Sequence, residues 1–94
     1  MPENEIRYGN GFLRDVRKLP REAQVKLAFL LEIMRENAFA PEMHTKPLKA
    51  TLRGKYSFRI TRQLRVGFMF ESRNVIKLLI ADHRDTIYRR LGKL

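Results

Sequence analysis

Three short runs of alternating apolar and polar residues dominate the second half of this chain. They extend from Lys55 to Thr61, from Leu64 to Glu71 and from Val75 to Asp82, with only two or three residues between them. A β-strand points successive side chains to opposite faces, so each run has one face of large aromatic and branched residues. Because connections this short join antiparallel neighbours, the pattern predicts a three-stranded antiparallel meander with one buried face.

The two faces of this meander differ in chemistry. The expected buried face carries Tyr56, Phe58, Ile60, Leu64, Val66, Phe68, Phe70, Ile76, Leu78 and Ile80. The other face carries Arg59, Arg65 and Lys77 among smaller or apolar residues, namely Ser57, Gly67, Met69, Leu79 and Ala81. Charged side chains are rarely buried without a partner, so we expect this cationic face to be the more open one.

After a short opening strand, the first half of the chain has helical periodicity. Glu5 to Tyr8 alternates and is expected to join the sheet. Asn10 is a suitable N-cap for a helix that Pro20 closes, and a second helix is predicted from Arg21 to Glu36. A link this short makes the two helices a hairpin. The second helix has a wide apolar stripe, which predicts burial against both the sheet and the first helix: Ala23, Val25, Leu27, Ala28, Phe29, Leu30, Leu31, Ile33 and Met34.

The remaining segments complete a single domain. Residues 37–52 contain Ala40-Pro41 and Lys46-Pro47 and are predicted to be a loop. The segment from Thr86 to Leu91 is compatible with either a helix or a strand. The element order is then strand, helical hairpin and antiparallel meander, which is an α+β architecture. We expect residues 1–94 to form one domain.

The positive charge of the chain is large and uneven. The formal net charge is +10, and the part from Arg53 onward holds eleven Lys and Arg against three Asp and Glu. The first fifty-two residues hold nine against seven, so most of the excess belongs to the sheet half. A small basic protein with a cationic sheet face is most simply a nucleic-acid contact device.

Several other classes of protein are not favoured by the sequence. There is no cysteine, so no disulfide or thiolate metal site is expected. No His, Asp and Glu cluster has metal-ligand spacing, and no glycine-rich phosphate loop is present, so we expect neither metal nor cofactor. No apolar run approaches the roughly 18 residues of a membrane span, and the N-terminus lacks an apolar signal core, so we expect a cytoplasmic protein without membrane partners.

The order of short motifs resembles a known toxin superfamily. A helical hairpin is followed by Lys46-Pro47-Leu48, by Leu52-x-Gly54-x-Tyr56, by Tyr-x-Phe-Arg-Ile, by Leu-Arg-Val-Gly-Phe and by a closing His-Arg-Asp-x-x-Tyr. This succession resembles the RelE/ParE superfamily of toxin–antitoxin toxins over nearly the whole chain, and it looks closer to the RelE-type branch. That branch consists of mRNA interferases, which usually cut messenger RNA in the ribosomal A site.

The resemblance implies partners and a reaction. The chain would be a metal-independent endoribonuclease that cleaves mRNA by attack of the ribose 2′-hydroxyl. It would contact mRNA and ribosomal RNA, and an acidic antitoxin protein would neutralise it. The toxin alone would be a monomer, and it would form a hetero-oligomer with the antitoxin.

The resemblance also implies roles for individual residues. Arg65 matches the arginine that faces the scissile phosphate, and Tyr88 matches the C-terminal aromatic residue. Arg84 matches the basic residue before that aromatic. The basic pair of the preceding strand matches Ser57 and Arg59, so only half of the pair is basic here. Other branches use a histidine near the C-terminus, for which His83 is the nearest candidate.

The chemistry of RNA cleavage suits these residue types. A base removes the 2′-hydroxyl proton, cations stabilise the phosphorane, and an acid protonates the leaving oxygen. His83 and Tyr88 are the candidates for proton transfer, and the choice between them stays open. Arginine binds two phosphate oxygens at once, which suits Arg59, Arg65 and Arg84. The cations expected to bind the RNA backbone are Lys46, Lys49, Lys55, Arg62 and Lys77.

Two other functions remain open at this point. A ParE-type inhibitor of DNA gyrase has the same fold and needs no catalytic site. An inactive member would serve only as a binding module, and the serine at position 57 makes that alternative real. Each site residue also has a structural interpretation: Arg59 and Arg65 as solvated charges, His83 as a cap at a strand end, and Tyr88 as an aromatic at the core edge.

Overall fold

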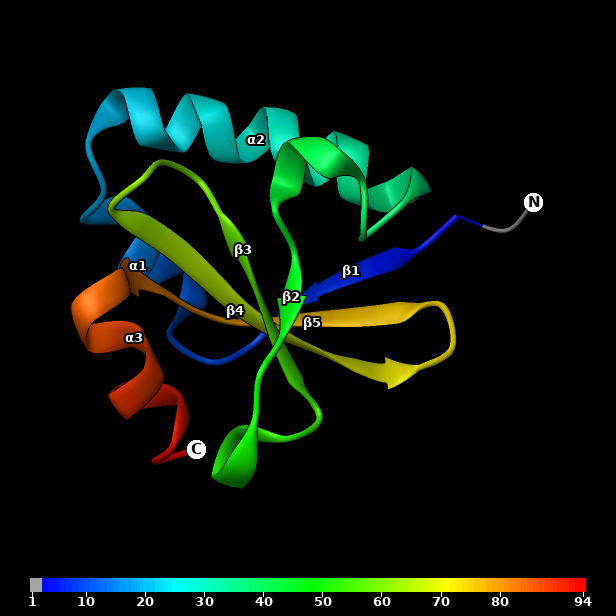
Figure 1. Cartoon of the computed structure of the whole chain (residues 1–94). Helices are drawn as coiled ribbons and strands as arrows, with labels where there is room; N and C mark the ends of the chain where they lie inside the picture. Colours follow the sequence, from blue (N-terminus) through cyan, green and yellow to red (C-terminus); the bar gives the residue numbers. More distant parts are fainter. Residues whose placement is uncertain (1–2) are drawn as a thin grey trace.

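A mixed five-stranded sheet is the centre of the protein (Figure 1). The computed structural model describes residues 3–94. The predicted meander is present as β3 (Lys55–Arg59), β4 (Leu64–Ser72) and β5 (Val75–His83). β1 (Glu5–Tyr8) pairs in parallel with β5, and β2 (Lys46–Pro47) pairs antiparallel with β3. The strand order is therefore β1-β5-β4-β3-β2.

Within the described residues, three α-helices pack on the two faces of this sheet. α1 (Phe12–Arg17) and α2 (Arg21–Glu36) follow β1, and α3 (Arg84–Leu91) follows β5. α2 has the predicted bounds, and the C-terminal segment is a helix rather than a strand. α1 is shorter than predicted, because Gly11 rather than Asn10 is its N-cap, with a left-handed φ of 86° that favours glycine. The α+β order of strand, helical hairpin and meander is confirmed.

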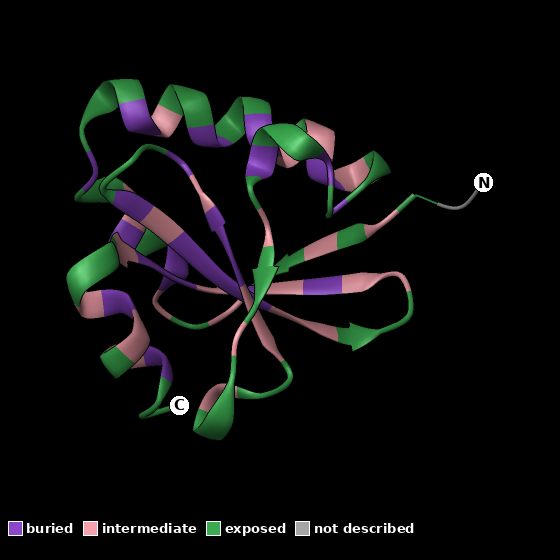
Figure 2. Cartoon of the chain, in the orientation of Figure 1, coloured by how far each residue is buried: buried purple, intermediate pink, exposed green. Residues whose placement is uncertain are grey.

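The main core lies between the sheet and the α1–α2 hairpin (Figure 2). The rings of Phe58 and Phe68 are completely buried in it, and the partly buried rings of Tyr56 and Phe70 pack against them. Complete burial of one such side chain stabilises the fold by about 1.5–3 kcal/mol. Met43 from the 37–52 segment is also completely buried. That segment is therefore packed onto the core, and it contains β2 and two short 3-10 helices, Pro41–Met43 and Ala50–Leu52.

The apolar surface of α2 is narrower than the sequence pattern predicts. Its buried residues are Ala23, Leu27, Leu30 and Met34. Val25 and Phe29, which the stripe places in the core, are 62% and 58% exposed. The reason is that α2 lies over one face of the sheet only, so residues on its outer side have nothing to pack against.

The second face of the sheet is not the open surface expected from its charges. α3 lies over it and forms a small apolar cluster in which Ile87 and Leu91 pack against Ile80. Gly67 provides the space for this helix, because a Cβ at that position would lie 2.7 Å from both methyl carbons of Leu91. Ser57, on the same face, is only 1% exposed. α3 therefore covers the middle of this face and leaves the arginines at its margin.

A β-bulge in β5 changes the predicted alternation. Phe68 pairs with Leu78, but the next pair is Gly67 with Ile80, so Leu79 is an extra residue. The bulge turns Ile80 to the α3 side and Ala81 into the main core, which reverses the predicted faces of both residues. A simple two-residue period cannot show such an insertion, because both residues are apolar.

Candidate functional site

Two arginines face each other across neighbouring strands at the margin of the α3-covered face. Arg59 of β3 and Arg65 of β4 are cross-strand partners, and both side chains are partly buried. Like charges directly opposite one another destabilise a sheet unless an anion lies between them. Asp82 of β5 is the other cross-strand partner of Arg65, but its carboxylate bonds Arg90. Within residues 3–94 neither arginine of the pair forms a salt bridge, and the Nε atom of each is buried without a hydrogen-bond acceptor. The two positive charges and the two Nε–H donors without acceptors are what an anion-binding site requires.

Two buried hydroxyl groups lie on the same side of the sheet. Ser57 precedes Arg59 by two residues, so both side chains leave β3 on one face. Its Oγ atom and the phenolic oxygen of Tyr88 on α3 are both buried without a partner in the described part of the chain. Buried polar atoms normally find hydrogen-bond partners, so each exception calls for an explanation. The Tyr88 oxygen and the two arginine Nε atoms indicate a site adapted to a polar ligand.

The unpredicted strand β2 brings a cation to this site. Lys46 pairs with Ser57, and its Nζ atom lies 5.7 Å from the centre of the Tyr88 ring. A cation at this distance from an aromatic ring is attracted to it. The contact places Tyr88 next to the β2–β3 side of the sheet, and Arg59 of β3 pairs with Arg65 of β4. The structure therefore brings Arg59, Arg65, Lys46 and Tyr88 to one region.

His83 lies apart from that group. His83 is the cross-strand partner of Leu64, and side chains of paired residues share a face, so the imidazole leaves the sheet on the side opposite Arg65. His83 is exposed and precedes α3 as its N-cap residue. Arg84 is exposed too, and its backbone N–H donates to the carbonyl of Gln63 at 2.8 Å. The structure does not bring His83 to the arginine pair.

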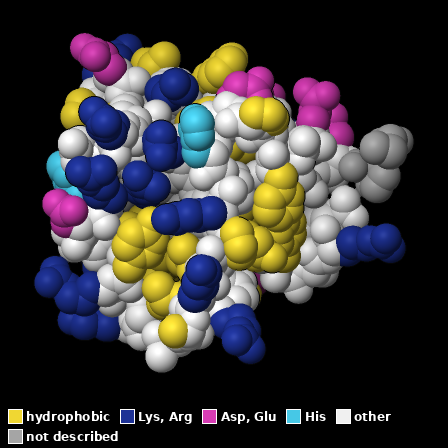
Figure 3. Space-filling model, viewed as in Figure 1, with side chains coloured by type: hydrophobic (Ala, Val, Ile, Leu, Met, Phe, Trp, Pro, Cys, Tyr) yellow, Lys and Arg dark blue, Asp and Glu magenta, His cyan; other side chains and the backbone are white. Residues whose placement is uncertain are grey.

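The other predicted RNA-binding cations divide into two places. Lys55 and Lys77 flank Met69 in one row across β3, β4 and β5, and together with Leu79 they line a groove of about 280 Å³. Lys49 and Arg62 are exposed on the loop before β3 and on the β3–β4 turn. Figure 3 shows that Lys and Arg side chains gather over α3 and the neighbouring strand ends, with hydrophobic side chains among them.

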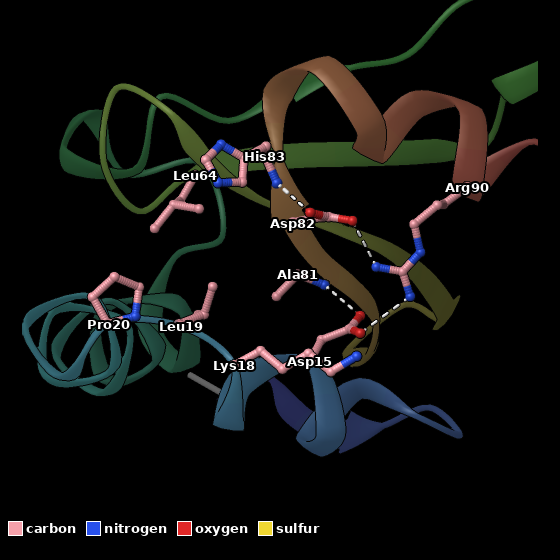
Figure 4. A pocket seen from close by; sticks show the side chains of 9 residues that line it. All are labelled: Asp15, Lys18, Leu19, Pro20, Leu64, Ala81, Asp82, His83 and Arg90. Carbon is pink, nitrogen blue, oxygen red and sulfur yellow. Dashed lines mark hydrogen bonds and ion pairs between the residues drawn. The ribbon is translucent and has the colours of Figure 1, made fainter.

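A network of two aspartates and one arginine lies beside the site, and the sequence pattern did not predict it. Arg90 of α3 bonds Asp15 of α1 at 3.1 Å and Asp82 of β5 at 2.8 Å, and Asp15 also accepts a hydrogen bond from the backbone N–H of Ala81 at 3.1 Å (Figure 4). Burial alone would raise the pKa of the Asp82 carboxyl, but the hydrogen bond and charge of Arg90 and the N–H of His83 outweigh it, so this pKa lies below its usual range. The same bonds raise the pKa of Arg90.

This network borders a cavity of about 380 Å³. Lys18, Leu19, Pro20, Leu64 and His83 complete its lining (Figure 4). In the sequence, Asp15 stands between basic residues of a short helix and looks like a solvated charge. Only its burial, at 7% exposure, identifies it as part of the interior. No three acidic or histidine side chains within residues 3–94 lie close enough to hold a metal ion.

Comparisons with known proteins identify the fold. No protein-family model matches the chain. No curated protein sequence matches it either. A YoeB/ParE toxin from Agrobacterium tumefaciens superposes with a TM-score of 0.74 at 17% identity, covering 85% of this chain and 98% of that one. The chain has the RelE/ParE toxin fold.

Other solved structures with the RelE/ParE toxin fold give TM-scores of 0.70 or more. YafQ from E. coli gives a TM-score of 0.74 at 13% identity over 90% of this chain and 98% of that one. The toxin–antitoxin complex RelBE2 from Mycobacterium tuberculosis gives 0.70 at 24% identity over 89% and 94%. The fold expected from the motif resemblance is thus confirmed. The matched structures carry RelE, YoeB, YafQ and ParE names, so the likeness spans several branches.

No helix of residues 3–94 combines the length and the apolar character that crossing a membrane requires.

Proposed function

We propose that this protein is the toxin of a type II toxin–antitoxin system and that it cleaves mRNA in the cytoplasm. The observation that carries the proposal is the pair Arg59 and Arg65, which face each other and form no salt bridge within residues 3–94, on the face of the sheet that α3 and Tyr88 cover. A solvated surface would not retain two opposed cations with buried, unpartnered donors. A phosphate group supplies the charge and the acceptors that this pair lacks.

The reaction follows from the chemistry of these groups. The scissile phosphate lies between the two guanidinium groups, which stabilise the extra negative charge as the 2′-oxygen attacks phosphorus. The 2′-hydroxyl loses its proton, the bond to the 5′-oxygen breaks, and that oxygen takes up a proton. The products are a 2′,3′-cyclic phosphate and a 5′-hydroxyl end. Tyr88 is the proton-transfer group that lies on the arginine side of the sheet, and no step requires a metal.

The neighbouring cations supply affinity without reading sequence. Lys46 adds a positive charge beside the Tyr88 ring. Lys49, Arg62 and Arg84 are exposed around the same margin and can contact the backbones of mRNA and ribosomal RNA. Ribosomal binding would present the mRNA to the arginine pair in a single-stranded form.

The partner that neutralises the toxin is proposed to be an acidic antitoxin. Structures of similar fold from M. tuberculosis and Staphylococcus aureus are the RelBE2 toxin–antitoxin complex and a YoeB–YefM complex. The groove between Lys55 and Lys77, with Met69 and Leu79 as its apolar lining, suits an amphipathic acidic segment. The toxin would be a monomer alone and a hetero-oligomer with its antitoxin.

One observation favours a second candidate function. Ser57 stands where the resemblance expects a basic residue, and it is buried under α3 rather than facing a ligand. A ParE-type gyrase inhibitor, or an inactive binding module, would tolerate this loss because neither needs a transition-state contact.

Expression of Arg65→Ala distinguishes these functions. We expect the wild-type protein to cleave mRNA on programmed ribosomes and to leave gyrase supercoiling unchanged. The variant should fold normally and lose roughly 10²–10³ in cleavage rate. Arg73→Ala, in the exposed β4–β5 turn, is the matched control and should cleave like the wild type. Inhibition of supercoiling without cleavage would instead establish the gyrase inhibitor.

A further inference from the structure

The carboxylate of Asp15 takes the place of a missing strand neighbour. β1 pairs with β5 only as far as Leu78, so the edge of β5 beyond that residue has no strand beside it. The Oδ2 atom of Asp15 accepts the backbone N–H of Ala81 there, at 3.1 Å. The contact joins residues 66 positions apart in the chain. α1 is thereby attached to the strand that leads directly into α3.

Arg90 extends this attachment from the strand to the helix. Its Nη2 atom lies 3.1 Å from Asp15 Oδ1, and its Nη1 atom lies 2.8 Å from Asp82 Oδ2. A planar guanidinium held by two carboxylates from different elements has little freedom to rotate. Asp82 is held in turn by the backbone N–H of His83 at 2.7 Å. The network therefore determines where one side of α3 sits relative to β5 and α1.

Helix geometry places Arg90 and Tyr88 on opposite flanks of α3. Successive residues differ by about 100° around a helix. Ile87 and Leu91 point down into the small apolar cluster. Relative to the direction midway between these two residues, Tyr88 lies about 80° to one side and Arg90 about 80° to the other. Any roll of the helix about its axis that displaces Arg90 must therefore displace Tyr88 as well.

The apolar contacts of α3 do not prevent such a roll by themselves. The helix has two completely buried residues, Ile87 and Leu91, and it rests above Gly67, which presents no side chain. Apolar contacts are not directional, whereas a bidentate arginine is. Tyr88 makes no hydrogen bond through its hydroxyl, so its own polar group does not hold the helix. The backbone N–H of Arg84 fixes the start of α3 to the carbonyl of Gln63, and within the described chain Arg90 provides the hydrogen bonds from an α3 side chain to other elements.

We propose that Asp15 is a positioning residue, which acts through Arg90 to set the rotation of α3 and so hold Tyr88 beside Lys46 and the arginine pair. This inference rests on the proposed function, because it gives Tyr88 a place in RNA cleavage. α1 contributes no residue to the arginine site. Through Asp15, it would nevertheless control the geometry of that site. A displacement of about 1 Å in a reacting group costs roughly 10² in rate.

The variant Asp15→Asn tests the proposal with little change in shape. The amide oxygen can still accept the N–H of Ala81, but the negative charge that holds Arg90 is lost. We expect the cleavage rate constant kcat to fall roughly 10²-fold while KM stays unchanged. In a Tyr88→Phe background the same change should have little further effect, because Asp15 then has no hydroxyl to position. Glu32→Gln, which removes the exposed pair between Glu32 and Arg35, is the matched control and should leave kcat unchanged.

A measurement without RNA separates this proposal from the proposed function. In protein with ¹³C-labelled tyrosine rings, Asp15→Asn should shift the NMR signal of Tyr88 and weaken its contact with Lys46, while Tyr8 and Tyr56 keep their signals. Arg90→Lys, which can hold one carboxylate but not both, should give the same pattern and serves if Asp15→Asn does not fold. An unmoved Tyr88 signal with unchanged kcat would overturn the positioning role. If the Tyr88 signal moves but the wild-type protein does not cleave RNA, the proposed nuclease activity is wrong. The positioning of Tyr88 by Asp15 would still hold.

Discussion

Arg59 and Arg65 lie directly opposite each other on β3 and β4, and neither forms a salt bridge within residues 3–94. Asp82 is the partner of Arg65 on β5, but its carboxylate bonds Arg90. The opposition costs stability in the free protein and creates affinity for an anion. Sites that retain an unfavourable arrangement of this kind are commonly functional.

Removal of one of the two charges should stabilise the free protein. Arg59→Met keeps a long unbranched side chain and removes the like-charge contact, so the free energy of unfolding should rise by about 0.2–1 kcal/mol. Thermal unfolding in phosphate-free buffer measures this. Added inorganic phosphate should then stabilise the wild type more than the variant. A lower stability of Arg59→Met without phosphate would contradict the interpretation of the pair.

Tyr88 should matter more than His83 for RNA cleavage. Tyr88→Phe keeps the ring and its packing but removes the buried hydroxyl, so cleavage on programmed ribosomes should fall by roughly 10²–10⁴. His83→Gln should have a small effect, because the imidazole leaves the sheet on the other side. The reverse order would restore His83 as the proton-transfer group. Full activity of both variants would place proton transfer elsewhere.

Binding of single-stranded RNA should depend strongly on salt. If about five phosphates are neutralised, the slope of log K against log salt concentration should be near −3.5. Lys49→Ala should reduce that slope by about 0.7, since it removes one exposed phosphate contact. A titration series at several salt concentrations measures both values. A flat response would show that the positive charge serves a purpose other than RNA binding.

The Asp82–Arg90 contact should stabilise the protein near neutral pH and not in acid. The folded protein holds the pKa of Asp82 below its unfolded value of about 3.9, so the stabilisation is present above that value and is lost as the pH falls through the folded pKa. Asp82→Asn should therefore be less stable than the wild type at pH 6, by about 1 kcal/mol for a partly exposed pair. The difference should shrink steadily below pH 4. A difference independent of pH would assign the effect of the variant to packing.

Much of the fold was predictable because its signals are local. The alternation in residues 55–82 and the short turns between the runs specify a meander, and α2 has the bounds that its periodicity predicts. Local patterns also placed Arg59 and Arg65 on one face, since a strand alternates strictly until a bulge occurs. The exposure of Phe29 was not predictable, because an apolar residue on a helix does not reveal whether any element lies beside it.

By itself, the sequence determined the order of strands and helices, the apolar face of the meander and the concentration of positive charge in the sheet half. Only the tertiary structure decided which charges share a site. The bulge at Leu79 and the pairing of Leu64 with His83 separate His83 from Arg65, while β2 brings Lys46 to Tyr88. Asp15, Asp82 and Arg90 meet across three elements far apart in the chain. Such contacts depend on how elements dock onto one another, and periodicity within a segment carries no information about docking.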